Sequence, residues 1–353
     1  MEPWRDCGWR TGLGTCFYNR RSEVERLSSL LDGFSLVVLV GPRNAGKSEL
    51  ARYTLLRVKR VKPMIVDARR VVAKAGLGER LEPLGERVVG AVARIVEEKA
   101  GLGALLDLVS GIHRELALDE YVVIDEVHLV ARDALRELEA LAKLLRFYPE
   151  YRRWKMIVTC SEGFLLAQGL ADRLDGYGAR ILLLEPLSEE DAHALYEEYV
   201  EKRGCRLGWS LYWGLIGGLP GYLPDYCAMN PDELRHWVQE RLTSLISALL
   251  EAAREARIDP AEALRAAHEL LVEGQPVLTP LHLTLSKVLV HKNIAYQAGL
   301  RLKPQLRVYT VALALWASHG YNKPPNPQDV IKAVEEEDMV YNPRKREEGS
   351  QFQ

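Results

Sequence analysis

The stretch LVVLVGPRNAGKSELARYTL, residues 36–55, decides the fold of this 353-residue chain. An apolar run ends at Gly41, and Gly46, Lys47 and Ser48 begin a segment with the apolar spacing of a helix. The residues from Gly41 to Ser48 fit the pattern G-x-x-x-x-G-K-[ST]. Glycines let such a loop wrap closely, so that backbone N–H groups and the helix N-terminus point at one anion. The pattern therefore predicts a phosphate-binding loop between a buried strand and a helix.

The residue types in this loop also predict the ligand. We expect Lys47 to reach the outer phosphates of a nucleotide and the Ser48 hydroxyl to bind Mg²⁺. A chance match is expected in about 1% of chains of this length, and the flanking strand and helix favour a working ATP or ADP site. The residues predicted to contact the nucleotide here are Gly41, Pro42, Arg43, Asn44, Ala45, Gly46, Lys47, Ser48 and Glu49.

A second motif, EYVVIDEVHLV at residues 120–130, places two acids after an apolar run. Asp125, at the carboxyl end of a strand, would hold Mg²⁺ beside the loop. Glu126 would polarise the attacking water as a general base. The alternative is a helix N-terminus that favours acids for electrostatic reasons alone. His128 is either a sensor of the nucleotide or, more commonly, a packing histidine.

The composition narrows the class of protein. The net charge is -2 and 48% of the residues are hydrophobic, as in an ordinary globular protein. No apolar run approaches the length of about 18 residues that a membrane helix needs, and no hydrophobic signal segment begins the chain, so we expect a cytoplasmic protein. The five cysteines are odd in number and lack CxxC spacing, which argues against a disulfide framework and against a zinc site.

Short apolar runs alternate with amphipathic segments as far as Pro186, which indicates an α/β fold with a parallel sheet buried on both faces. The predicted strands are 35–40, 63–66, 121–125, 155–159 and 180–184. The predicted helices between them include 48–58, 84–99, 104–116 and 131–145. Beyond Pro186 the chain is predicted to be helical at 189–202, 210–216, 231–256 and 260–272.

The segment 274–328 contains no Asp or Glu, although the chain as a whole is slightly acidic. A helix over 280–290 followed by two short strands predicts a winged-helix-like domain there. The sequence thus predicts five regions: an N-terminal arm at 1–15, a P-loop ATPase core at 16–186, a helical lid at 187–256, a basic winged-helix-like domain at 257–345 and a disordered tail at 346–353.

Five motifs in this order resemble the archaeal ATPase family, part of the STAND class of P-loop NTPases that lies close to AAA+ proteins. They are CFYNRRSEVERL at 16–27, the phosphate-binding loop, VVIDE at 122–126, LLLEPLSEEDA at 182–192 and IGGLPGYL at 216–223. The resemblance covers residues 16–315. It implies a core sheet of strand order 5-1-4-3-2, a helical lid, a C-terminal winged helix, and ATP hydrolysis used as a conformational switch.

The resemblance also implies particular site residues. The segment around Arg20 would lie against the adenine, with Pro220 of the lid near the base. Asn19 and Arg21 depart from the Gly and Glu of the family pattern. Related ATPases carry a polar residue that responds to the γ-phosphate where Thr159 and Ser161 stand. Ser161 is the better candidate, and a Ser-Glu-Gly turn is the alternative. The predicted catalytic residues are Lys47, Asp125, Glu126 and Ser161.

Three functions are compatible with these features. The first is an ATPase whose basic C-terminal domain binds duplex DNA, with candidate contacts at Lys287, Lys292, Arg301, Lys303 and Arg307. The second is a signalling-type STAND ATPase whose C-terminal domain binds protein and whose oligomeric state follows the nucleotide. The third, a different nucleotide enzyme such as a small-molecule kinase, is disfavoured because no second catalytic constellation follows residue 186. Arg43, Arg69 and Arg70 either reach phosphates or a neighbouring subunit, or are surface arginines.

Overall fold

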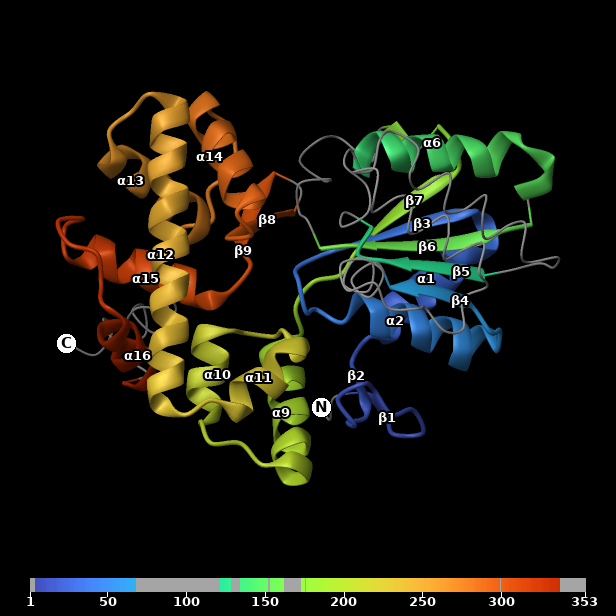
Figure 1. Cartoon of the computed structure of the whole chain (residues 1–353), viewed down its shortest axis with the longest axis horizontal. Coiled ribbons are helices and arrows are strands. Elements are labelled where there is room, and N and C mark those ends of the chain that lie inside the picture. The colour runs from blue at the N-terminus through green and yellow to red at the C-terminus, as the bar shows by residue number, and fades with distance from the viewer. Residues whose placement is uncertain are drawn as a thin grey trace, which may run out of the picture. The chain divides into compact units, whose positions relative to one another are not determined.

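The computed structural model describes residues 4–67, 121–127, 134–151, 153–161, 173–174, 176–298 and 300–336. The chain divides into two compact units (Figure 1). The sheet unit comprises Arg20–Gly41 and Gly46–Glu185, and the helical unit comprises Met1–Asn19, Pro42–Ala45 and Pro186–Gln353. Outside the described residues lie Arg69, Arg70, His128, the helices predicted at 84–99 and 104–116, and the predicted tail at 346–353.

The sheet unit is built on five parallel strands. They are β3 (Leu36–Val40), β4 (Met64–Asp67), β5 (Tyr121–Asp125), β6 (Lys155–Cys160) and β7 (Ala179–Leu183). Their order across the sheet is β4-β5-β6-β3-β7. Numbered from β3 and read from the β7 edge, this order is 5-1-4-3-2. The strand β6 therefore lies between β3 and β5, the two strands that carry the predicted motifs.

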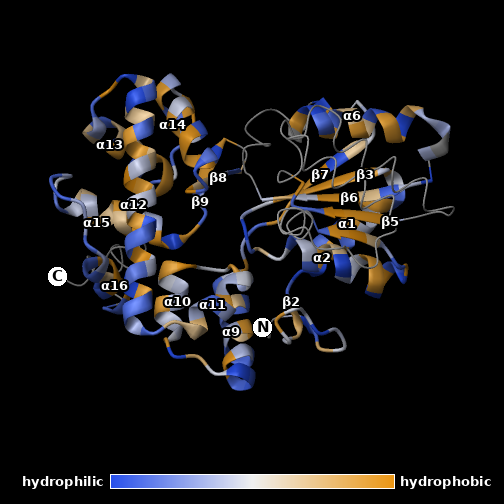
Figure 2. Cartoon of the chain, in the orientation of Figure 1, coloured by the Kyte–Doolittle hydropathy of each residue, from blue (hydrophilic) through white to orange (hydrophobic). Residues whose placement is uncertain are grey.

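Helices lie on both faces of this sheet (Figure 1). One face carries α1 (Arg21–Gly33), α2 (Lys47–Tyr53) and the π-helix η1 (Thr54–Lys59), and the other carries α6 (Ala134–Phe147), after which a short 3-10 turn, η3, spans Pro149–Tyr151. The strands are apolar along most of their length because both of their faces are buried (Figure 2). Alternate strand residues such as Val38, Ile124 and Val158 form one core cluster with Leu138 and Leu141 of α6.

The helical unit contains most of the remaining elements. They are β1 (Arg5–Asp6), β2 (Phe17–Tyr18), α9 (Glu189–Arg203), α10 (Trp209–Leu215), η4 (Pro220–Tyr222), α11 (Leu223–Ala228), α12 (Pro231–Ala256), α13 (Pro260–Leu271), α14 (Pro280–His291), β8 (Ala295–Ala298), β9 (Arg301–Pro304), α15 (Arg307–Ser318) and α16 (Pro327–Glu335). The long helix α12 packs against α13, α14, α15 and α16. The strands β8 and β9 pair antiparallel directly after α14. Throughout the described parts of the chain, no helix combines the length and the apolar character needed to cross a membrane.

Capping residues explain where these helices begin. The side chains of Ser188, Asn230, Asp259, Thr279 and Asn326 each accept a hydrogen bond from a backbone N–H in the first turn of the helix that follows. Four of these helices also begin with proline, whose missing N–H would have no partner at that position. Such signals are local in sequence, and the predicted starts of α9, α12, α13 and α14 accordingly agree with the observed ones within about two residues.

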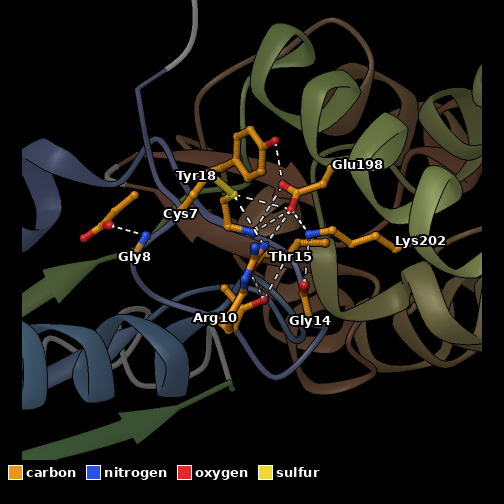
Figure 3. A network of polar contacts seen from close by, with 11 residues as sticks. Cys7, Gly8, Arg10, Gly14, Thr15, Tyr18, Glu198 and Lys202 are labelled. Carbon is orange, nitrogen blue, oxygen red and sulfur yellow. Dashed lines mark hydrogen bonds and ion pairs between the residues drawn. A yellow bond between two sulfur atoms is a disulfide. The ribbon is translucent and has the colours of Figure 1, made fainter.

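The N-terminal residues form a hairpin attached to α9. The strand β1 pairs antiparallel with β2, and a disulfide joins Cys7 to Cys16. Figure 3 shows that polar groups of this hairpin contact the carboxylate of Glu198 on α9. The Cys16 N–H donates to both carboxylate oxygens at 3.1 Å, and the Tyr18 hydroxyl donates to Oε2 at 2.8 Å. Arg10 and Lys202 add ion pairs to the same carboxylate.

The prediction of free cysteines was wrong for four of the five. A second disulfide joins Cys205, just after α9, to Cys227 on α11. Cys160 takes no part in a disulfide, and it is buried at the end of β6. The count and spacing of cysteines carry no information on which pairs meet in space, because pairing requires Cα atoms within about 7 Å of each other. In both pairs the Cα atoms are 4.3 Å apart.

Candidate functional site

The loop after β3 begins at a glycine that no other residue could replace without a clash. Gly41 has φ 153°, and a Cβ atom built on it would lie 2.2 Å from the backbone oxygen of Leu184. The chain next to β3 is therefore held close to the end of β7. At the other end of the loop, Gly46 has φ 95° and stands at the N-cap of α2. The two invariant glycines of the pattern thus occupy conformations outside the range of ordinary L residues.

Lys47 lies at the first position of α2 with 4% of its surface exposed. Its Nζ atom donates a hydrogen bond to the backbone oxygen of Gly41 at 3.1 Å. The ammonium group is thus folded back over the start of the loop, next to the N-terminus of α2. A lysine in this position can exchange a neutral carbonyl oxygen for a charged phosphate oxygen, which is the stronger acceptor for its protons.

Ser48 and the acid of the second motif lie together. The Ser48 hydroxyl is 2.7 and 2.8 Å from the two carboxylate oxygens of Asp125. The hydroxyl of Thr159, fully buried at the end of β6, donates to Asp125 Oδ1. The register of β5 and β6 pairs Ile124 with Val158, so the next residue on each strand comes to the same edge of the sheet. The predicted juxtaposition of loop and acid is present.

Glu126 is held by hydroxyl groups at the end of β6. Its backbone N–H donates to Thr159 Oγ1 at 3.0 Å, and the Ser161 hydroxyl donates to its Oε2 atom. Glu126 has φ 59°, an uncommon value for a residue other than glycine, and 6% of its surface is exposed. Backbone strain of this kind persists where surrounding contacts impose it, and it is frequent in active sites. Glu126 and the predicted residue Ser161 are therefore brought together.

Thr159 is the residue whose role the sequence reasoning missed. It was considered as a sensor, and Ser161 was preferred. The structure gives each hydroxyl one acid to hold: Thr159 contacts Asp125 and Ser161 contacts Glu126. The available signal was the alternation of a strand, because Thr159 and Ser161 are two residues apart at the end of β6 and so face the same way, and the two acids follow at the end of the neighbouring strand β5.

Arg20, predicted to lie near adenine, is buried within the sheet unit with 6% of its surface exposed. Its guanidinium donates to Glu23 Oε1 at 2.9 Å and to the backbone oxygen of Glu185 at 2.8 Å. Burial acts to raise the pKa of Glu23, but hydrogen bonds from Ser22 and Arg20 outweigh it and leave the pKa below its usual value. Arg20 thus links the start of α1 to the end of β7.

The tip of the loop, residues 42–45, belongs to the helical unit. The backbone N–H of Gly221, next to Pro220 in η4, donates to the Asn44 oxygen at 3.0 Å. The Tyr222 phenol also contacts the Asn44 side chain, and burial raises the pKa of that phenol. The predicted lid motif IGGLPGYL is therefore in contact with the phosphate-loop motif through Asn44. Within the loop, Ala45 is buried, and Glu49 is half-buried on α2.

The five basic residues proposed for DNA have different surroundings. Lys287 on α14 and Arg301 on β9 are exposed. Lys292 pairs with Glu251 at 2.7 Å, and the Arg307 guanidinium lies 4.4 Å from the centre of the Trp213 ring. Lys303 is half-buried on β9. Lys287, Lys292 and Arg301 are thus exposed, and of these Lys292 is engaged by Glu251.

The oxygen atoms at this edge of the sheet suit a magnesium ion. The Ser48 hydroxyl and the Asp125 carboxylate are oxygen donors already within hydrogen-bonding distance of each other, and Mg²⁺ prefers one or two carboxylates together with phosphate oxygens and waters. No cluster of three or more His, Cys, Asp or Glu side chains suited to a metal occurs among the residues that the structure describes. A metal site here would therefore take ligands from the nucleotide as well as the protein.

No protein-family model matches the chain. No curated protein matches it either. Solved structures do match. A Walker-type ATPase of Pyrococcus abyssi is 19% identical, with 84% of this chain and 96% of that chain covered and a TM-score of 0.49. The ADP form of the ORC2 protein of Aeropyrum pernix is 15% identical, covering 89% and 94% of the two chains with a TM-score of 0.42.

A third similar structure is the RuvB Holliday junction branch migration motor of Thermotoga maritima, 13% identical, with 86% of this chain and 96% of that chain covered and a TM-score of 0.40. These solved structures are P-loop NTPases. The sheet unit, with its five parallel strands, its phosphate loop after β3 and its acids after β5, has the P-loop NTPase fold.

Proposed function

We propose that the chain binds Mg-ATP at the loop after β3 and hydrolyses it. The observation that carries this proposal is the set of contacts from Ser48 through Asp125 and Thr159 to Glu126, within one buried strand edge. If the phosphate-loop sequence were a chance match, nothing would require an acid beside the Ser48 hydroxyl. Asp125 stands there, at the end of β5, which is separated from β3 by β6. This arrangement supplies a metal-binding pair and a base beside one phosphate loop.

Each residue has one task in this proposal. Lys47 moves from the Gly41 oxygen to a phosphate oxygen, and the loop N–H groups hold the phosphates. Ser48 and Asp125 would hold Mg²⁺, which neutralises charge developing on the transferred phosphoryl group. Glu126 accepts a hydrogen bond from the attacking water and orients it. Ser161 fixes the carboxylate of Glu126 in the direction of that water.

The direct test compares two variants by nucleotide binding and by phosphate release. Lys47→Ala should lose ATP binding. Glu126→Gln should keep ATP binding and lower turnover by about 10²- to 10⁴-fold, the usual contribution of a general base. Wild-type affinity in Lys47→Ala would contradict the assignment of the loop, and unchanged turnover in Glu126→Gln would move the base elsewhere.

We further propose that the nucleotide state controls binding of duplex DNA, because Lys287 and Arg301 are exposed on α14 and on the ribbon β8–β9 in a segment without acidic residues. The full chain should bind a labelled duplex with an affinity that falls steeply between about 50 and 200 mM salt. The double variant Lys287→Ala/Arg301→Ala should bind less tightly, and its salt dependence should be reduced by about one unit per lost contact. Lys323→Ala, outside these elements, is the control.

The alternative is a signalling ATPase whose C-terminal part binds a protein. In that case duplex DNA does not bind at low salt, and the size of the protein in solution changes between ADP and a non-hydrolysable ATP analogue. Measuring turnover with and without DNA, together with size in each nucleotide state, separates the two. Stimulation of turnover by DNA favours the DNA-binding ATPase.

A further inference from the structure

Two adjacent aromatic side chains are exposed where α6 ends. Phe147 is the last residue of α6 and Tyr148 follows it, with 60% and 53% of their surfaces exposed. Of the large apolar side chains exposed in the part of the chain that the structure describes, these two alone are aromatic. An exposed group of large apolar side chains commonly marks a surface that binds a partner.

The turn that carries these rings is folded and anchored. The Tyr148 N–H donates to the Leu144 oxygen and the Tyr151 N–H to the Tyr148 oxygen, both at 3.1 Å. Tyr151 and Trp154 are buried in the core of the sheet unit, with ring centres 5.9 Å apart in an edge-to-face arrangement. The chain thus buries the two later aromatic residues of this segment and leaves the two earlier ones at the surface.

Basic residues accompany the exposed rings. The segment RFYPEYRRWK, residues 146–155, contains four Arg or Lys and one Glu. Within it, Arg146 is exposed on the last turn of α6, directly before Phe147. The Phe147 ring packs edge to face against Tyr177 with 6.3 Å between ring centres, and Lys143 Nζ lies 4.9 Å from the centre of the Tyr177 ring.

The nearby acid on α6 is already paired with cations. Glu139 lies 2.7 Å from Lys143 Nζ and 3.9 Å from the Arg173 guanidinium. Arg146 and Arg153 are exposed in addition to this group. The rings therefore lie in surroundings of positive charge, which attract an anionic partner.

This surface is distant in the fold from the phosphate loop. Lys155 begins β6 and Tyr177 precedes β7, so the exposed rings belong to the amino ends of these strands. The phosphate loop follows the carboxyl end of β3, which is parallel to both. The whole surface belongs to the sheet unit, and it shares no residue with the proposed nucleotide site.

The chemistry of the surface indicates its partner. An exposed ring offers a face on which a nucleic-acid base stacks, and arginine or lysine beside it pairs with the phosphates. In a duplex the faces of the bases are covered by their neighbours, whereas an unpaired strand can present them. We propose that Arg146, Phe147 and Tyr148, here called the ring surface, bind single-stranded nucleic acid. This proposal goes beyond the proposed ATPase and does not depend on it.

The first test measures binding of labelled oligothymidine and oligouridine, each of about 20 nucleotides, to the full chain without ATP. Each stacked base commonly contributes about tenfold in affinity, so Phe147→Leu/Tyr148→Leu should lower the affinity by about a hundredfold. Leucine keeps an apolar side chain and removes the face of the ring. Tyr148→Phe keeps the ring and should bind as the wild-type chain does. The two strands distinguish DNA from RNA as the preferred ligand.

The second test separates charge from stacking. Arg146→Gln should weaken binding and reduce the slope of log affinity against log salt by about 0.7, the value for one phosphate contact on a single strand. A strand of the same length whose sugars carry no bases should bind the wild-type chain about as weakly as the leucine variant binds oligothymidine. Leu250→Ala and Arg254→Gln, at exposed positions of α12, are the matched controls and should leave affinity unchanged.

The outcomes are decisive in each case. Wild-type affinity in the leucine variant, or equal affinity of the wild-type chain for strands with and without bases, overturns the inference. So does a wild-type chain that binds neither strand. Binding of a labelled duplex should be the same in the leucine variant and the wild type, which keeps this test separate from that of Lys287 and Arg301. Thermal unfolding identifies a folding defect, and if the leucine variant has one, Arg146→Gln and the strand without bases give the answer.

Discussion

At the scale of single residues, the candidate site depends on two hydroxyls that hold two consecutive acids. Asp125 and Glu126 are adjacent in sequence, and each carboxylate accepts a hydrogen bond from its own hydroxyl, from Thr159 at the end of β6 or from Ser161 just after it. This division lets neighbouring carboxylates do different work, one for the metal and one for the water. The hydroxyls act through the acids and are positioning residues.

The variant Thr159→Val tests this division. Valine has nearly the shape of threonine without its hydroxyl, so Asp125 loses a donor and the Glu126 N–H loses an acceptor. Because loss of a group that orients a metal ligand commonly lowers metal affinity by about 10- to 100-fold, nucleotide binding should require correspondingly more Mg²⁺. Titration of Mg²⁺ at fixed nucleotide measures the effect. Thr243→Val, at an exposed site on α12, should have none.

A second residue-scale prediction concerns pH. Burial acts to raise the pKa of Glu198, but hydrogen bonds from Lys202, Tyr18 and the Cys16 N–H outweigh it, and the pKa lies below its usual 4.5. The charged carboxylate therefore stabilises the native state above pH 4.5, and this stabilisation is lost as the pH falls through the lowered native pKa.

Glu198→Gln should accordingly lower the free energy of unfolding by about 2 kcal/mol at neutral pH. The difference from wild type should shrink as the pH is lowered below 4.5. Urea unfolding at several pH values measures both effects. Glu201→Gln, an exposed glutamate on the same helix, is the control. A difference that stays constant with pH would show that the charge of Glu198 is not responsible.

Sequence spacing was sufficient to place Lys47 and Ser48 at the start of a helix and Asp125 at the end of a strand, because such ends are visible in the apolar pattern. It was insufficient for Thr159, whose role depends on strand register, and for Gln305, whose contact with Arg43 joins distant parts of the chain. Pairs of this kind are set by tertiary packing, which no local pattern encodes.

At the scale of elements, too, features with local sequence signals were predicted, whereas contacts between distant residues were not. The strands and the helices α12, α13 and α14 were predicted closely, since their ends carry proline, capping side chains or a change in apolar spacing. The short helices α11 and α16 were not predicted, although Asn326 and Pro327 give the start of α16 the same local signals. The two disulfides were also missed, and they connect elements rather than continue them.

The two disulfides lead to a prediction about the stability of the chain. Each closes a short loop, with cysteines 9 and 22 residues apart, and a native disulfide of a small loop commonly contributes about 2 to 4 kcal/mol. Addition of a reductant should therefore lower the denaturant midpoint of the wild-type chain. A variant with Cys7, Cys16, Cys205 and Cys227 all changed to serine should unfold at the lower midpoint already. Reductant should not lower the midpoint of this variant further. A further decrease would show that Cys160 is involved.

A further element-scale prediction concerns the exit from β3. Gly41→Ala places a methyl group against the Leu184 carbonyl, which belongs to the backbone and cannot rotate away. We expect a loss of about 1 to 3 kcal/mol in stability from this overlap, with weaker nucleotide binding because the start of the loop must move. Gly33→Ala is the control, since no atom lies within 4 Å of its added Cβ. Unchanged stability in Gly41→Ala would contradict the close approach.

At the scale of the whole molecule, the phosphate-loop motif is divided between the two units. Gly41, Lys47 and Ser48 belong to the sheet unit, whereas Arg43 and Asn44 belong to the helical unit. The motif is continuous in sequence, so this division could not be inferred from its spacing. It follows from the contacts of Asn44 with Gly221 and of Arg43 with Gln305.

Ligand binding should therefore be visible in the stability of the whole chain. A nucleotide at a concentration of about 100 times its dissociation constant stabilises the native state by about 2.7 kcal/mol. Calorimetry with and without a Mg-ATP analogue should show this as an upward shift of thermal unfolding, resolved into more than one transition if the units unfold separately. Lys47→Ala should show no shift. A shift of equal size in that variant would place the nucleotide elsewhere.

The strand order has a consequence for synthesis of the chain. Both neighbours of β3 come late: Leu36 pairs with Met156 on β6 and with Ala179 on β7. As the polypeptide leaves the ribosome, LVVLV thus remains an apolar segment with both hydrogen-bonding edges open until most of the sheet unit has been made. Segments of this composition associate with their own kind when left unpaired. Nascent or truncated chains that end before residue 155 would be the form most in need of a chaperone.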